Sequence, residues 1–168
     1  MITTERLRLR PAEPGDLADL HAVFAHPAAM RYWSHETHET IAQTQATLDG
    51  MMESFDQTGL ELVIQRDGTV VGKAGLWRMA EIGYILHPDH WGQGLAREAL
   101  LEIIAAAWRT HPELAQITAE IDPRNQASIR LLTHLGFALT HSDSRTLHVY
   151  GEWCDSDFYA LPRPAHSR

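Results

Sequence analysis

The 168-residue sequence has only one cysteine, Cys154, and few basic side chains. A single cysteine excludes an internal disulfide and is typical of a reducing compartment. Fourteen Lys and Arg residues stand against 22 Asp and Glu, so at a formal charge of −8 we expect no general binding to nucleic acid or membrane. No stretch approaches the ~20 apolar residues of a membrane span, and the start, MITTERLRLR, lacks a signal peptide's apolar region. The sequence predicts a cytoplasmic protein.

The composition that remains is that of one globular domain. Hydrophobic residues make up 44% and charged residues 21% of the chain, which is enough apolar material for a sizeable core. We find no repeat and no low-complexity linker, and we expect a single domain over residues 1–161. Two prolines and polar ends in residues 162–168 predict a flexible tail.

Hydrophobic periodicity and turn residues predict a mixed α/β fold. The predicted order is a strand at residues 7–9, helices over 14–24 and about 37–55, strands at 60–64, 70–76 and 80–87, a helix over about 95–109, a strand at 115–121, a helix at 125–135, and a hairpin over 137–161 that turns near Gly151. Asp67-Gly68 supplies the turn chemistry of a hairpin. About seven strands therefore form a mixed sheet, with about four helices on its faces.

A glycine loop precedes the most regular predicted helix. Gly92 and Gly94 lack Cβ atoms, so a ligand can approach the backbone, and the helix that follows presents free N–H groups to an anion. By itself the loop fits tight packing equally well. It is not a P-loop, because no G-x-x-x-x-G-K-[ST] run exists. A dinucleotide fingerprint fails as well, because Arg97 stands where a small residue is needed.

Two blocks of sequence are similar to the GNAT acetyltransferases. Residues 81–100 read EIGYILHPDHWGQGLAREAL, and residues 125–137 read NQASIRLLTHLGF. Both resemble the Rim-type branch, which acetylates the N-termini of ribosomal proteins, and the two ends of the chain fit that branch too. Trp91 replaces the Gln or Arg that usually opens the superfamily's loop, as in Rim-type enzymes.

The resemblance implies a mostly antiparallel mixed sheet, splayed where acetyl-CoA binds as co-substrate, and no metal. Main-chain N–H groups of the loop would hold the pyrophosphate, and the strand at residues 84–87 would pair with the pantetheine arm. The implied cofactor-binding residues are Ile85, Leu86, His87, Trp91, Gly92, Gln93, Gly94, Leu95, Ala96, Arg97, Asn125 and Ser128.

The implied reaction passes the acetyl group directly to a primary amine, and the Rim-type likeness favours a protein or peptide N-terminal α-amine. Ser128 would return a proton to the CoA thiolate. The glutamate that serves as candidate base in Rim-type enzymes falls on Leu147, which leaves Glu81, the preferred candidate, or the neighbouring His148. Tyr32 and Trp33 either line the acceptor cleft or belong to the core.

Several alternatives stay open. The protein could be a silent acyl-CoA-binding sensor or scaffold, an acetyltransferase of a small-molecule amine, or an acidic interaction module without a cofactor. It could be a monomer or a homodimer. The His35-x-x-His38 and His87-x-x-His90 pairs lack the third and fourth ligands that zinc needs, so we expect hydrogen-bonded histidines. No base is evident beside Cys154, so we expect a structural cysteine rather than a covalent acyl-enzyme.

Overall fold

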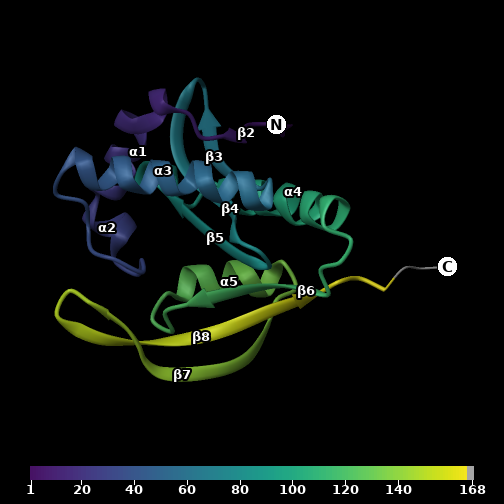
Figure 1. Ribbon diagram of the computed structural model, residues 1–168. Helices are drawn as coiled ribbons and strands as arrows, with labels where there is room; N and C mark the ends of the chain where they lie inside the picture. Colours follow the sequence, from purple (N-terminus) through teal and green to yellow (C-terminus); the bar gives the residue numbers. More distant parts are fainter. Residues whose placement is uncertain (166–168) are drawn as a thin grey trace.

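A computed structural model describes residues 1–165, and within them eight strands form one sheet. Their order is β1-β2-β3-β4-β5-β6-β8-β7 (Figure 1). The strands are β1 (Ile2–Thr3), β2 (Arg8–Pro11), β3 (Glu61–Arg66), β4 (Thr69–Arg78), β5 (Glu81–Leu86), β6 (Gln116–Ile121), β7 (Ala138–Val149) and β8 (Glu152–Pro162). The helices are α1 (Leu17–Phe24), α2 (Pro27–Met30), α3 (Ile41–Thr58), α4 (Leu95–Thr110) and α5 (Gln126–His134), with short 3-10 turns at Pro14–Asp16 and Pro88–His90.

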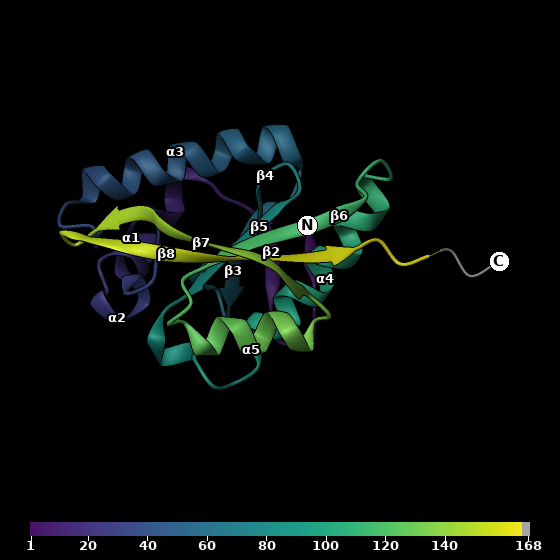
Figure 2. The ribbon, with the colours of Figure 1, turned by 90° about the horizontal axis from the view of Figure 1, so that it is seen from below.

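The helices divide between the two faces of the sheet. Figure 2 shows α3 on one side of the strands and α5 on the other. A larger core cluster joins α4 and α5 to the sheet through residues such as Leu62 and Leu100, and a smaller one joins α1 and α3 through Val63 and Leu48. Neighbouring residues of β3 thus serve opposite clusters, as the pleat of a strand requires.

The pairing pattern leaves one weak seam in the sheet. Every adjacent pair is antiparallel except β5 and β6, which are parallel and are registered only at Glu81 and Thr118. Beyond Glu81 the two strands separate, so main-chain groups of β5 lie free of the ladder. The expected splay of a mostly antiparallel mixed sheet is confirmed.

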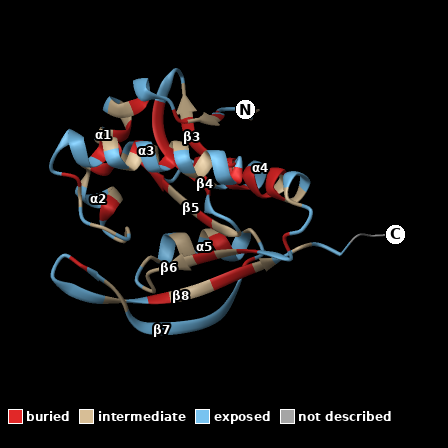
Figure 3. Ribbon diagram, viewed as in Figure 1, coloured by how far each residue is buried: buried red, intermediate tan, exposed pale blue. Residues whose placement is uncertain are grey.

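Most of the local predictions are confirmed. Asp67 and Gly68 have φ of 50° and 87°, and two positive φ values make the tight turn that joins β3 to β4. Leu7 and Leu9 are buried, as the alternation predicts. Figure 3 shows much of β3 in red, and β4 is buried along most of its length, whereas β7 is pale blue along most of its length.

The structure also corrects the sequence analysis. Two short elements, β1 and α2, are additional to those predicted, so the described chain has eight strands and five α-helices. The second predicted helix begins at Ile41 and not near residue 37, because Thr40 and Gln43 form a capping box there.

Part of the predicted tail is packed. Pro162 pairs with Gln116 at the end of β8. Arg163 donates to the carbonyls of Trp108, His111 and Leu114 at distances of 3.1, 2.5 and 2.7 Å. The last three residues of the predicted tail, 166–168, lie outside the described part. Within residues 1–165 no helix has the length and apolar character needed to cross a bilayer.

Candidate active site

The glycine loop lies between β5 and α4 and opens onto a cavity of about 460 Å³ on the α5 side of the sheet, here called the α5 cavity. Gly92 and Gly94 have φ of 69° and 76°, in the left-handed region that favours glycine. A Cβ on Gly92 would meet no atom within 4 Å, and one on Gly94 would meet only the Arg6 guanidinium at 3.7 Å. The glycines therefore serve the backbone conformation and leave the space in front of the α4 N-terminus open.

Side chains from outside the loop hold its shape. Trp91 Nε1 donates to the carbonyl of Leu86 at 2.9 Å. Arg6 Nη1 donates to the carbonyl of Gln93 at 2.8 Å, and Arg66 Nη1 donates to the Gln93 side-chain oxygen at 2.6 Å. Arg6 is in turn paired with Glu98 in the first turn of α4. The loop is therefore braced before any ligand arrives, with two cationic side chains beside it.

Ten of the twelve residues predicted to bind the cofactor line the α5 cavity. They are Ile85, Leu86, Trp91, Gly92, Gly94, Leu95, Ala96, Arg97, Asn125 and Ser128. His87 and Gln93 are not among its lining residues. The ring of His87 packs against His26 at 5.0 Å, and the Gln93 side chain bonds to Asp89 and Arg66.

Two buried polar atoms on this side of the molecule have no hydrogen-bond partner among residues 1–165. They are Tyr84 Oη and His90 Nδ1, and both residues line the α5 cavity. Burial raises the pKa of Tyr84 to about 12, an effect that the nearby Ser128 hydroxyl partly offsets without completing a hydrogen bond. Burial and the Arg66 charge lower the pKa of His90. The sequence predicts neither Tyr84 nor His90 as a site residue, although both lie within residues 81–100, the block that resembles the GNAT acetyltransferases.

These features suit an elongated ligand with a phosphate group. The braced loop offers main-chain N–H groups at the start of α4, the released edge of β5 offers further main-chain groups, and the unpartnered atoms require a ligand atom or a water. The residues present therefore fit acetyl-CoA.

A second cavity of about 510 Å³, here called the α3 cavity, lies on the opposite side of the sheet, against α3. Its lining includes six carboxylates: Glu61, Glu81, Glu120, Asp122, Glu152 and Asp155. Four cationic side chains face them: Arg31, Lys73, Arg78 and Arg124. Six carboxylates against four cations leave a formal excess of two negative charges.

Ion pairs account for most of these charges. Buried Lys73 pairs with buried Glu61, Arg78 pairs with Glu81 at 2.5 Å, and Arg124 bridges Asp122 and Glu152 at 2.6 and 2.9 Å. Among residues 1–165, Glu120 accepts only from the hydroxyl of Ser156, at 2.6 Å. One carboxylate oxygen of Glu61, Oε2, is buried without a partner among the described residues.

The two candidate bases lie in different places. Glu81 lines the α3 cavity at the start of β5, where it accepts from Trp77 Nε1 at 3.2 Å as well as from Arg78. On β7, Leu147 and Val149 line the same cavity, but His148 between them does not, and its ring packs against exposed Trp153 at 5.2 Å. The strand's alternation therefore turns His148 away from the site, and this placement argues against His148 as a base.

Tyr32 and Trp33, with Arg31, line both cavities. Trp33 Nε1 donates to His35 Nε2 at 3.1 Å, and the Lys73 ammonium lies 5.5 Å from the centre of the indole. Tyr32 lies under two guanidinium groups, those of Arg31 and Arg124. Both residues therefore border cavities, and Trp33 also packs against the smaller core cluster; that they line an acceptor cleft stays a prediction.

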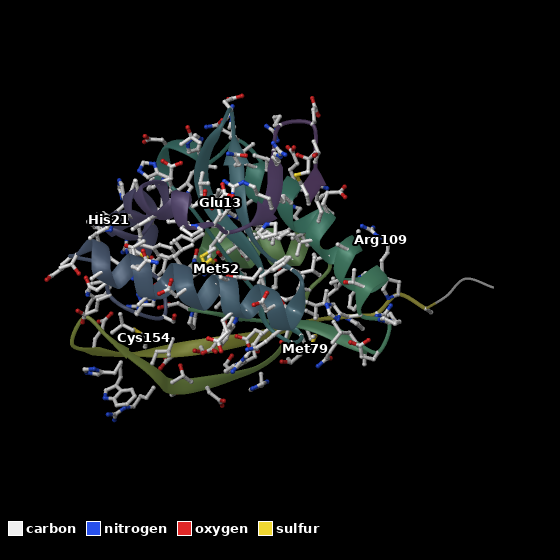
Figure 4. The ribbon with its side chains drawn as sticks, turned by 45° about the horizontal axis from the view of Figure 1, so that its top comes forward. Glu13, His21, Met52, Met79, Arg109 and Cys154 are labelled. Atoms are coloured by element: carbon white, nitrogen blue, oxygen red, sulfur yellow. The ribbon has the colours of Figure 1, made fainter. Side chains whose placement is uncertain are left out.

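Cys154 on β8 also lines the α3 cavity, half-buried, and its sulfur accepts from Arg124 at 3.2 Å. Figure 4 shows it beside β8, on the opposite side of the molecule from Arg109. The cysteine thus faces a cavity and is not part of the core, and its structural rather than covalent role stays a prediction.

Comparison with known proteins decides what this arrangement belongs to. Residues 6–138 match the family described as an acetyltransferase (GNAT) domain. The chain belongs to the GNAT acetyltransferase family. It is therefore an acetyl-CoA-dependent N-acetyltransferase that acts on amines, as the sequence predicted.

Relatives of this GNAT chain cover nearly its whole length. An uncharacterized N-acetyltransferase of Bacillus subtilis, YoaA, is 27% identical over 98% of this chain and 97% of its own. The spermidine N(1)-acetyltransferase of Escherichia coli is 26% identical over 91% of this chain and 84% of its own. An acetyltransferase of Salmonella typhimurium, solved with its cofactor acetyl-CoA, is 26% identical, covers 98% of both chains and has a TM-score of 0.74.

The Rim-type branch is a finer assignment. The enzyme of Salmonella typhimurium that modifies the N-terminal serine of ribosomal protein L7/L12 has a TM-score of 0.78 and covers 96% of this chain, but it is only 18% identical. That likeness shows the fold alone. The GNAT family is thus established, and membership of the Rim-type branch stays a prediction from the sequence.

Proposed function

We propose that this GNAT enzyme moves acetyl from acetyl-CoA in the α5 cavity directly to a primary amine in the α3 cavity. The observation that carries the proposal is that the cavities lie on opposite faces of the sheet and share Arg31, Tyr32 and Trp33. Acetyl-CoA supplies an activated acetyl thioester. The two-sided arrangement lets that thioester and the amine meet at the separation of β5 and β6 without competing for one entrance.

Groups of the chain itself bind the phosphate, stabilise the developing charge, take up the proton of the amine and lie beside the departing sulfur. Main-chain N–H groups at Gly92 and Gly94 hold phosphate, and free N–H groups of β5 stabilise the charge that develops on the carbonyl oxygen. Glu81 lies on the amine side and takes up, directly or through water, the proton that a protonated primary amine must lose before its nitrogen can attack. Ser128 lies on the cofactor side, where the sulfur departs.

The lining of the α3 cavity favours an acceptor with positive charge beyond the reacting amine. Glu120 has only a neutral partner, and Glu61 keeps one unpartnered oxygen, so two carboxylates can still take N–H donors. Small polyamines have this character, and the relative from Escherichia coli is named for spermidine. A peptide N-terminal α-amine is the second candidate, supported by the Rim-type sequence blocks.

Release of free CoA thiol, measured with a thiol-reactive dye, tests the proposal. The purified protein is offered acetyl-CoA with spermidine, methionine sulfone, neutral amino acids or short peptides. We expect the fastest release with the polyamine, and Glu120→Gln should raise its KM several-fold with little change in kcat. Glu102→Gln, an exposed carboxylate on α4, is the matched control and should change neither constant.

Each outcome separates the alternatives. Binding of acetyl-CoA without thiol release for any amine would refute transfer and favour a silent acyl-CoA-binding protein. Preference for peptides, with kinetics insensitive to Glu120→Gln, would refute the cationic acceptor and favour the α-amine.

A further inference from the structure

The side chain of Tyr84 carries a buried hydroxyl to which the site described above assigns no role. Its Oη is inaccessible to solvent and has no hydrogen-bond partner among residues 1–165, although the α5 cavity that it lines is roomy. A buried donor without a partner costs free energy comparable to a lost hydrogen bond. At a ligand cavity the missing acceptor is either a water or an atom of the ligand, and the position of Tyr84 decides which ligand atom it could be.

The position of Tyr84 on β5 restricts which acceptor that is. Glu81 and Tyr84 are three residues apart on the strand, so their side chains leave opposite faces of the sheet. The structure agrees, since Glu81 lines the α3 cavity and Tyr84 lines the α5 cavity and packs against the core shared with α4 and α5. The proposed base and the Tyr84 hydroxyl therefore lie on the two sides of the point where β5 leaves β6.

Ser128 defines the immediate surroundings of the hydroxyl. It lies in the first turn of α5, where Asn125 Oδ1 caps its N–H at 3.2 Å, and its own hydroxyl is near enough to Tyr84 to affect the phenol's acidity. Two hydroxyl-bearing residues from different elements, one on β5 and one on α5, thus lie near each other in the lining of the α5 cavity. The amine arrives from the α3 side, so the atom that departs on the α5 side is the sulfur.

We propose that Tyr84 Oη donates a hydrogen bond to the sulfur of CoA as it leaves, which makes Tyr84 a catalytic residue alongside Ser128. This assignment rests on the transfer reaction proposed above. In that step the amine nitrogen bonds to the acetyl carbon, the C–S bond breaks, and its electron pair stays on the sulfur. The proton that the amine loses goes toward Glu81 or solvent, and Tyr84 keeps its own proton.

Acidity explains why the phenol donates a hydrogen bond and does not transfer its proton. Burial raises the pKa of Tyr84 to about 12, whereas a thiol ionises near ~8.5. A proton moved from this phenol to a thiolate would go to the much weaker base. Tyr84 therefore stays protonated at every working pH and stabilises the thiolate as a fixed donor.

The test compares Tyr84→Phe with Tyr159→Phe, which removes a hydroxyl from a buried tyrosine on β8 that lines neither cavity. Thiolate absorbance of bound CoA is titrated against pH, with the desulfo-CoA complex as the blank. We expect the bound thiol's pKa in the wild-type protein to lie below that of free CoA. Tyr84→Phe should raise it by about one unit, a tenfold change in the thiolate ratio, and Tyr159→Phe should leave it unchanged.

A second readout separates this role from a structural one. Tyr84→Phe removes an unsatisfied polar atom, so without CoA the variant should melt at the same temperature as the wild type or higher. An unchanged thiol pKa in Tyr84→Phe would overturn the assignment even if acetyl transfer is observed. A Tyr84-dependent thiol pKa with no transfer to any amine would support the assignment and refute the proposed function.

Discussion

Replacing Lys73 with methionine tests how the α3 cavity is held together. The Lys73 ammonium pairs with Glu61, whose side chain is 1% exposed, and Glu61 Oε2 has no partner among residues 1–165. Methionine keeps most of the side chain's length and removes its charge. Glu61 is then left buried without a counter-charge, an arrangement much less stable than the pair itself.

Two physical limits set the expected loss in the free energy of unfolding. An unpaired buried charge costs about 3–5 kcal/mol. The carboxylate can escape that cost by taking up a proton, and for a glutamate that ionises near pH ~4.3 in the unfolded chain this uptake costs about 1.4 kcal/mol per pH unit. Protonation of Glu61 would therefore cost about 4 kcal/mol at pH ~7.3 and about 2 kcal/mol at pH ~5.8, and the smaller of the two costs sets the loss. The loss should therefore shrink as pH falls.

Urea unfolding at both pH values measures the loss, with the wild type alongside at each pH. The double variant Glu61→Met/Lys73→Met is the control, because replacing both partners with apolar side chains of similar size is often neutral or stabilising. A loss below about 1 kcal/mol for Lys73→Met, or the same loss at both pH values, would refute the reasoning.

Three further predictions concern the loop, the base and a buried histidine. Gly94→Val should weaken acetyl-CoA binding at least tenfold, about 1.4 kcal/mol. The control is Gly59→Val, because Gly59 also has a positive φ but lies at the C-terminal end of α3, far from the loop. Gly59→Val should leave the affinity measured by calorimetry unchanged, and equal affinity in both folded variants would contradict the phosphate assignment. Glu81→Gln should lower the rate more at pH 6 than at pH 9, where free amine is plentiful, whereas His148→Gln should leave the pH–rate profile as it is; an unchanged profile for Glu81→Gln would mean that the amine arrives neutral. Burial, with His35 and His21 nearby, lowers the pKa of His38 to about 4. Between pH ~6.5 and ~4 the unfolded chain therefore binds a proton that the folded chain does not, and the free energy of unfolding decreases as the pH is lowered through this range. His38→Gln should flatten that slope by up to about 1.4 kcal/mol per pH unit in urea titrations, and parallel slopes would count against it.

Features set by neighbours in the chain could be predicted from the sequence. The turn at Asp67-Gly68 and the apolar stripe of α4 depend on a few adjacent residues, and both appear where the pattern predicts them. The glycine loop belongs with them, because positive φ and a following helix are local properties. Helix α2 has only four residues, Pro27–Met30, too few for any periodicity to show.

Features set by distant residues could not be predicted. Arg163 reads as part of a polar tail, but its guanidinium lies at the end of α4 and satisfies three main-chain carbonyls there. The direction of His148 depends on how β7 aligns with β8, and that register shifts between Asp143 and Leu147. A candidate base could be chosen from its residue type, but its face could only come from the pairing.

The alternation of β5 gives the candidate site its chemical order. On β5, Glu81 lines the cavity rich in carboxylates against α3, and Tyr84 lines the cavity behind the glycine loop. The proposed proton acceptor, Glu81, and the proposed hydrogen-bond donor to the sulfur, Tyr84, thus lie on opposite faces of the strand. Because β5 pairs with β6 only at Glu81 and Thr118, the strand's free edge opens between them. A slip of β5 by one residue would turn both side chains to the opposite face, so the antiparallel pairing of β5 with β4 also fixes the side of the sheet on which the proposed base lies.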